Sequence, residues 1–177
     1  MDRLTREALL GAYKTGQRDF DQIDLSGIQL FEVDLRQINL QASRLDGIYI
    51  PYGNLSLANL RHTSLVKAQL ADINLYGADL CFALLVEADL GRADLRGASL
   101  YQADLSGANL SGADLRQADL TKANLVGANL SGAKLDGATL SRASLGRCNL
   151  FRATGADLRD CYCDRTTVLP DGYTYGR

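Results

Sequence analysis

Few side chains in this sequence are of types and spacings that support catalysis. His62 is the only histidine, so one chain cannot supply a histidine-based metal site or a Ser-His-Asp triad. Asp94 and Asp114 are paired carboxylates, twenty residues apart, of the kind used in general acid–base chemistry. Arg96 and Arg116 follow them at the same spacing, so a solvated ladder of ion pairs is the simpler interpretation. With no phosphate-binding or hydrolase motif either, we expect a protein that is not an enzyme.

The four cysteines lack the spacing of a metal or redox site. Cys81, Cys148, Cys161 and Cys163 contain no Cys-x-x-Cys pair, and four cysteines in 177 residues are too few for a disulfide scaffold. The last three fall at inward positions of the repeat described below and are predicted to be core thiols. Cys81 falls at an outward position, so it is the one thiol expected to react. We expect neither a metal nor a cofactor.

A five-residue repeat determines where all these side chains lie. Every fifth residue from Leu25 to Leu150 is large and apolar, which makes 26 consecutive positions filled by 25 leucines and Ile50. The residue two before each is alanine at 16 of the 26, and the residue one before is Asp or Asn at 16. The repeats therefore read ADL or ANL followed by two variable residues. These two apolar series are the predicted core.

A period of five fits neither an α-helix nor a straight strand. On a helix, successive leucines would lie about 140° apart, and in a strand they would alternate between opposite faces. The leucines share one core only if the chain turns every five residues toward the same side, which predicts a solenoid of stacked, parallel-paired coils. Glycine follows two residues after nine of the leucines, as a type II turn with positive φ favours. The other repeats are expected to need another turn type.

The ADL and ANL repeats resemble the pentapeptide-repeat family, whose repeat centre is Leu or Phe with Ala two residues before and Asp or Asn one before. The resemblance covers roughly residues 20–170, and the Leu-centred pattern looks like that of cyanobacterial members. It implies an all-β fold, a right-handed quadrilateral β-helix with four repeats per coil. The repeats would make about seven coils.

Both ends of the chain depart from the repeat. Residues 3–14 predict a short helix with Leu4, Ala8, Leu9 and Ala12 on one side, which would cap the first coil. We therefore divide the chain into a capping helix and entry segment (1–19), the β-helix (20–170, unbroken over 25–150) and a C-terminal tail (171–177). The repeat breaks near 153–155, where three extra residues separate Leu150 from Leu158, and we expect a bulged insertion at a corner. The closing TTVLPDG resembles the usual terminator of the family.

Charge and hydropathy limit the choice of function. The net charge is −2, and neither half of the chain is strongly basic, so direct nucleic-acid binding is not expected. The N-terminus lacks a signal-peptide core and the chain lacks an apolar run of membrane-spanning length, so we expect a cytoplasmic protein without membrane contact. One branch of the resembled family inhibits type II topoisomerases by mimicking DNA. That alternative requires a strongly negative face, and the four sides here carry near-zero charge.

The leading interpretation is a rigid, non-catalytic protein-interaction or regulatory module, with an unknown protein or a second copy of the chain as its partner. A purely structural spacer is a further alternative. Outward apolar residues indicate where a partner would bind. The first candidate patch lies in the middle coils and consists of Val66, Cys81, Phe82, Leu84, Val86 and Tyr101. The second lies near the N-terminus and consists of Phe31, Tyr49, Pro51 and Tyr52.

Overall fold

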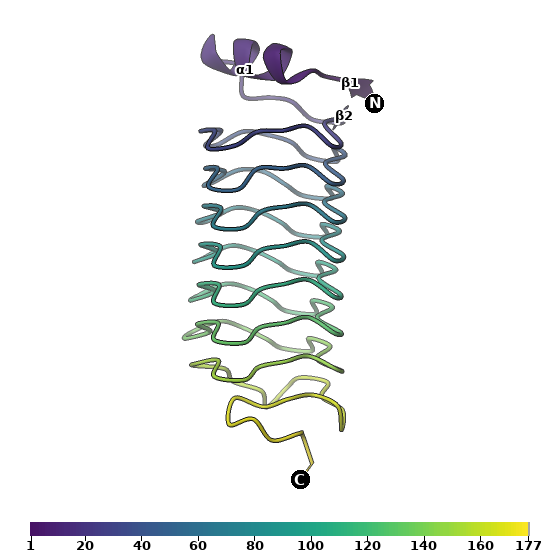
Figure 1. Cartoon of the computed structure of the whole chain (residues 1–177), viewed down its shortest axis with the longest axis vertical. Coiled ribbons are helices and arrows are strands. Elements are labelled where there is room, and N and C mark those ends of the chain that lie inside the picture. The colour runs from purple at the N-terminus through teal and green to yellow at the C-terminus, as the bar shows by residue number, and fades with distance from the viewer. Residues whose placement is uncertain (177) are drawn as a thin grey trace.

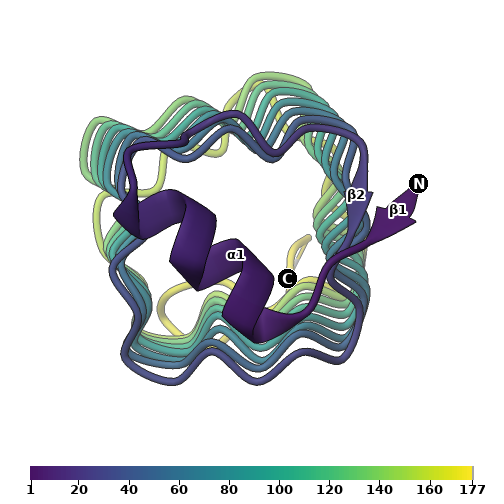
Figure 2. The ribbon, with the colours of Figure 1, turned by 90° about the horizontal axis from the view of Figure 1, so that it is seen from above.

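The computed structural model describes residues 1–176 and shows one long stack of coils (Figure 1). Isolated parallel bridges join residues twenty positions apart, from Asp19 with Asn39 to Lys134 with Thr154. Seen from above, the stack has four sides with a turn at each corner (Figure 2). Each side thus takes one five-residue repeat. We call this stack the rod.

Backbone hydrogen bonds explain why the coils stack so regularly. The N–H of Leu100 donates to the carbonyl of Asp119 at 2.7 Å, and the N–H of Asp119 donates to the carbonyl of Ala98 at 2.9 Å. The residue before each leucine therefore bonds to the preceding coil through both of its backbone groups. This pairing satisfies the main chain along each side without long strands.

All four corners use one backbone conformation, whether or not glycine is present. Gly107 has a φ of 67°, and Gln102 and Lys122 reach 55° and 59° at the equivalent position. In each case the following alanine N–H donates to the leucine carbonyl three residues earlier, as for Ala108 and Leu105 at 3.0 Å. The expectation of a different turn type in repeats without glycine is therefore wrong. Coil stacking imposes a positive φ that costs a non-glycine residue about 1–2 kcal/mol.

The core consists of the two apolar series, as predicted, except that Ile28 and Val33 of the second series are only half-buried. Leu25 to Leu150 at every fifth position are all buried, together with Ile50 and the alanines from Ala78 to Ala143. Two polar residues replace alanine inside the rod and are hydrogen-bonded there: the hydroxyl of Ser43 donates to Phe20 O, and that of Thr63 donates to Leu60 O. Burial of such groups is tolerated because their hydrogen bonds are made.

The N-terminal segment lies over the first coil. Strand β1 (Asp2–Arg3) pairs in parallel with β2 (Ile23–Asp24), and helix α1 (Arg6–Lys14) crosses the end of the rod (Figure 2). The helix begins at Arg6 rather than residue 3 because the side chain of Thr5 accepts the N–H of Ala8 as an N-cap. Its buried face is centred on Leu9, while Ala8, predicted to face the core, is exposed. Neither α1 nor any other part of residues 1–176 forms a helix long and apolar enough to cross a bilayer.

The break near 153–155 shortens the coil instead of adding a bulge to it. Beyond Thr154 the bridges join Ser144 to Tyr162 and Asn149 to Val168, which are 18 and 19 residues apart instead of 20. Leu150 and Leu158 are eight residues apart, whereas two full repeats would take ten, so this coil is two residues shorter than the others. The prediction of extra residues at a corner is therefore wrong, because the coil has lost residues instead. Of the predicted tail 171–177, residue 177 lies outside the described residues.

Candidate protein-interaction surface

All members of the first predicted patch but one reach the surface at neighbouring positions of the middle coils. Leu84 is 47% exposed, and Val66, Phe82, Val86 and Tyr101 are half-buried. We call these five residues the central surface. The 20-residue coil brings Val66 next to Val86 on one corner and Phe82 next to Tyr101 on the neighbouring corner, with Leu84 on the side between them.

Cys81 does not belong to this surface, although the sequence placed it outward and reactive. It is buried, and its sulfur lies 3.0 Å from the hydroxyl of Ser99 in the next coil. Burial, followed by the nearby Asp79 carboxylate, raises the pKa of the Cys81 thiol. Both effects reduce the thiolate fraction, so Cys81 is a poor nucleophile.

The rings of the central surface are stacked in a column that continues beyond it. His62 lies parallel to Phe82, with ring centroids 4.8 Å apart and planes 3° from parallel. Phe82 meets Tyr101 edge to face at 5.6 Å. Both arrangements are favourable geometries for aromatic pairs. His62 is not among the predicted members, although its position twenty residues before Phe82 places it in the neighbouring coil.

Two cationic side chains contact this aromatic column. The Arg61 guanidinium lies 5.5 Å from the Phe82 ring centre and also pairs with Asp79 at 3.2 Å. The ammonium of Lys122 lies 5.5 Å from the Tyr101 ring and donates to its hydroxyl at 3.2 Å. These contacts hold the rings in place.

The second predicted patch is only half present. Phe31 and Tyr52 are exposed and meet edge to face at 5.9 Å, and we call this pair the N-terminal surface. Tyr49 is half-buried and lies on the side of the rod that leads into this corner. Pro51 is buried and is not part of a contact surface, although Phe31 at the equivalent position of the preceding coil is exposed.

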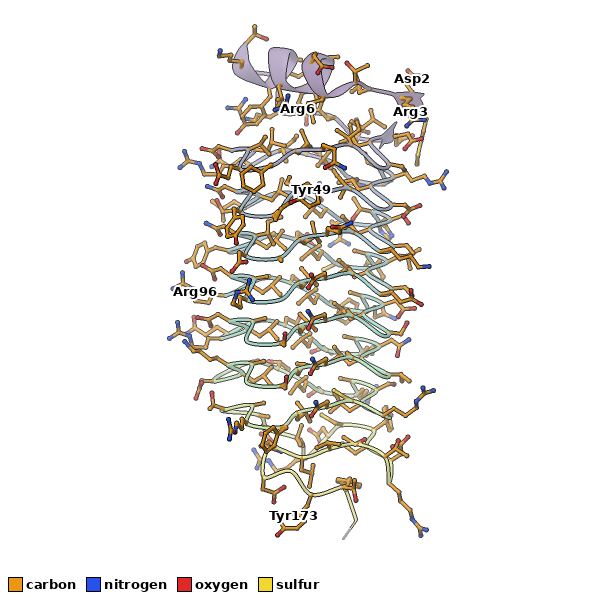
Figure 3. All side chains as sticks on the ribbon, viewed as in Figure 1. Asp2, Arg3, Arg6, Tyr49, Arg96 and Tyr173 are labelled. Atoms are coloured by element: carbon orange, nitrogen blue, oxygen red, sulfur yellow. The ribbon has the colours of Figure 1, made fainter. Side chains whose placement is uncertain are left out.

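A third pair of exposed apolar residues was not predicted. Leu57 and Tyr76 lie in successive coils at one corner and are 53% and 49% exposed. The Arg96 guanidinium lies 5.6 Å from the Tyr76 ring centre and extends from the rod into solvent (Figure 3). Both residues occupy outward positions of the unbroken repeat, so the rule used for the other two surfaces would have found them.

Comparison with known proteins now decides the family. The family model for pentapeptide repeats matches residues 54–80, 73–112 and 113–150, with eight copies. The chain belongs to the pentapeptide-repeat family. Members of this family are right-handed quadrilateral β-helices, and they are generally non-enzymatic structural or interaction modules.

Several solved pentapeptide-repeat structures are similar to this chain. HetL of the cyanobacterium Nostoc sp. strain PCC 7120, described as involved in heterocyst differentiation regulation, is 30% identical; the match covers 97% of this chain and 100% of HetL, with a TM-score of 0.41. Rfr23 of the cyanobacterium Cyanothece is 23% identical, with 90% and 96% covered and a TM-score of 0.33. QnrB1, a plasmid-mediated fluoroquinolone resistance protein, is 18% identical, with 92% and 89% covered and a TM-score of 0.46. Comparison with curated protein sequences gives no match.

The carboxylate ladder of this pentapeptide-repeat protein is a set of ion pairs. Arg96 binds Asp94 and Arg116 binds Asp114, each at 2.7 Å. The arginine hydrogen bonds lower the pKa of both aspartates, so both stay ionised at neutral pH and neither can act as a general acid. Within residues 1–176 no group of three His, Cys, Asp or Glu side chains is arranged to hold a metal ion.

Proposed function

We propose that this chain is a non-catalytic binding module whose central surface contacts a partner protein. In this proposal the rod is a right-handed quadrilateral β-helix of about seven coils, and α1 caps its first coil. The observation that carries the proposal is the column of His62, Phe82 and Tyr101 beside the exposed Leu84. Aromatic anchors next to exposed aliphatic side chains are typical of the residues that dominate binding energy.

The rigidity of the surface favours binding. Each ring of the column already rests against a neighbour, and the backbone beneath it is bonded to the coils on both sides, as in Phe82 N–H to Tyr101 O at 3.0 Å. Little side-chain or loop entropy would be lost when a partner binds. The ammonium of Lys122 beside Tyr101 favours a partner with an acidic group next to its apolar contact, whereas Asp79 offsets the charge of Arg61.

The ion pairs weigh against the DNA-mimic alternative. A DNA-like rod needs about one unpaired negative charge per 1.7 Å. Here the aspartates on one side of the rod are neutralised by arginines two residues later, in the pairs Asp34–Arg36, Asp94–Arg96 and Asp114–Arg116. A gyrase supercoiling assay tests this alternative directly, and we expect no inhibition.

The proposal is tested by two matched double variants. Phe82→Ser with Tyr101→Ser removes the anchors of the central surface, and Phe31→Ser with Tyr52→Ser removes the same kind of aromatic pair from the N-terminal surface. We expect both proteins to keep the melting temperature of the parent within a few degrees. Only the first should lose the main partner in a pull-down from the native host, or the dimer in light scattering if the partner is a second copy. Retention of parental affinity by the first variant would refute the proposal and favour a spacer role.

Leu84 allows a sharper single-residue test. It replaces the Asp or Asn that accepts a turn N–H elsewhere, as Asp104 does from Ser106 at 3.0 Å. Leu84→Asp should therefore restore this hydrogen bond, stabilise the rod by about 0.5–1.5 kcal/mol and weaken partner binding. Asn124→Asp, on the same side two coils later, is the control and should leave binding unchanged. A binding loss that accompanies destabilisation would indicate misfolding, not a lost contact.

A further inference from the structure

Backbone pairing stops on one side of the rod before the last coil. On this side, the N–H of Leu80, Leu100 and Leu120 donates to the carbonyl of the residue nineteen positions later, at 2.7–2.8 Å. Thr139, the last residue to accept such a bond, also donates its own N–H to Ala118 O at 2.9 Å. The next pair of backbone groups in this series is the N–H of Leu140 and the carbonyl of Ala138.

Neither of these two groups has a hydrogen-bond partner within residues 1–176. The cause is the shortened coil: the chain passes from Thr154 to Tyr162 in eight residues, whereas the preceding coil takes ten from Lys134 to Ser144. The segment is two residues too short to place a full repeat over Thr139. An unpaired main-chain donor and acceptor at a strand edge are a template for another strand.

The missing repeat leaves a cavity of about 400 Å³. Its lining comes from the open edge and from the segment that passes around it: Ala138, Thr139, Leu140, Ser141, Asp157, Arg159 and Asp160. Ala138 is 9% exposed, compared with 1% for Ala118 in the coil before, so the core reaches the cavity floor. The cavity therefore combines main-chain hydrogen-bonding groups with an apolar base.

The chain's own passing segment meets the edge beside the open pair, where the thiol of Cys161 donates to the carbonyl of Leu140 at 3.2 Å. The N–H of Arg159 donates to the carboxylate of Asp157 at 3.2 Å, and the Arg159 guanidinium pairs with the same carboxylate at 2.5 Å. The carbonyl of Asp160 accepts the N–H of Arg142 at 2.7 Å. None of these bonds reaches the N–H of Leu140 or the carbonyl of Ala138.

We propose that this cavity binds an extended peptide segment of another polypeptide, which adds one further repeat to the rod. One residue of the peptide would accept from Leu140 N–H and donate to Ala138 O, as Thr139 does with Leu120 and Ala118. The peptide residue before it lies over Ala138 and must be small. Leu140 is already covered, because it is 3% exposed and Leu158 of the passing segment packs against the core, so no core contact specifies the residue after it. The cavity thus selects a small residue followed by a polar one, as the rod's own repeats do.

This proposal is independent of the central surface, which lies several coils away, and it is tested with a peptide of the chain's own sequence. The probe is acetylated and amidated Gln-Ala-Asp-Leu-Thr-Lys, the sequence of residues 117–122. Its control carries an N-methyl group on the aspartate nitrogen, which removes the N–H that would bond to Ala138. Amide exchange and ¹H–¹⁵N shifts are followed at Leu140, with Leu120 as the matched internal reference.

In the free protein, we expect the Leu140 amide to exchange at least about 100-fold faster than that of Leu120. The peptide should slow exchange at Leu140 and shift its resonance, while the N-methylated control should do neither. Equal protection of both amides in the free protein would overturn the proposal. So would equal binding of the two peptides, or no change at Leu140 up to the solubility limit of the probe, which would mean that solvent alone occupies the cavity.

A repaired chain provides the second test. Replacement of residues 155–157, Gly-Ala-Asp, by Leu-Arg-Gln-Ala-Asp, the sequence of residues 115–119, adds the two missing residues. The new aspartate then lies twenty residues after Thr139, and Tyr162 lies twenty residues after Ser144. We expect this variant to protect the Leu140 amide by itself and to lose peptide binding. If it folds and binds the peptide as the parent does, the peptide does not occupy the place of the missing repeat.

Discussion

Replacement of Leu105 by alanine tests the inward and outward assignment of the repeat most directly. Leu105 is fully buried, and Leu85 and Leu125 occupy the same place in the coils on either side. The substitution removes three carbon atoms, which costs about 2–3 kcal/mol in transfer free energy alone. The coils cannot close over the cavity easily, because Leu105 N–H is bonded to Asn124 O and Leu85 N–H to Asp104 O, both at 2.7 Å. We therefore expect a total loss of about 3–5 kcal/mol, the upper part of the usual range for such substitutions.

The matched control is Ser106→Ala, one residue further along the chain. Ser106 is half-buried at a corner, and the hydrogen bond from its N–H to Asp104 uses the backbone, which the substitution keeps. Its effect should stay within about 0.5 kcal/mol. Urea unfolding followed by circular dichroism and by tyrosine fluorescence gives both values, and agreement of the two probes checks two-state behaviour. Equal shifts of the two midpoints would refute the assignment of leucines to the interior.

Three further predictions follow from the side-chain environments. With a thiol reagent and mass spectrometry, the half-exposed Cys163 should be labelled well before the buried Cys81. The hydrogen bond from Arg116 lowers the pKa of Asp114 in the folded protein below its unfolded value of 3.8. The Asp114–Arg116 pair therefore stabilises the fold above pH 3.8, and this stabilisation is lost as the pH falls through the pKa of Asp114 in the folded protein. The denaturant midpoint of Asp114→Asn should therefore fall less between about pH 5 and pH 2 than that of the parent. Gly107→Ala should cost about 1–2 kcal/mol in urea unfolding because Gly107 has a positive φ, whereas Gly11→Ala in α1, where the added carbon meets no atom within 4 Å, should stabilise by up to about 1 kcal/mol.

The rod's interior could be predicted from sequence because burial there depends on the repeat alone. Leu25 to Leu150 share one environment, and a period of five excludes every regular element except a coil. The number of sides could not be derived from the period and came from the family resemblance. The ends were less predictable, since Thr5 determines the start of α1 and the break depends on how many residues one side requires.

The surface residues could be predicted only where the neighbouring coil leaves them uncovered. Cys81 follows Leu80 and Pro51 follows Ile50, the position that the repeat directs outward. Their burial is decided by residues about twenty positions away, as when Ser99 contacts Cys81. Tyr101 occupies the same position and is half-exposed. A rule based on the repeat alone therefore identifies the corner but not the exposure of each side chain.

The departures from the repeat are informative because the repeat itself satisfies its own polar groups. An aspartate before the leucine accepts the N–H two residues later and often binds an arginine there, so a regular corner offers a partner few free groups. Leu84 breaks this arrangement: it gives up such a hydrogen bond, worth about 0.5–1.5 kcal/mol, and exposes an apolar side chain beside the aromatic column. The shortened coil gives up two main-chain hydrogen bonds beside Thr139 in the same way. Both losses lower the stability of the rod, and each leaves a feature that a binding partner could compensate, an apolar surface in one case and an open strand edge in the other.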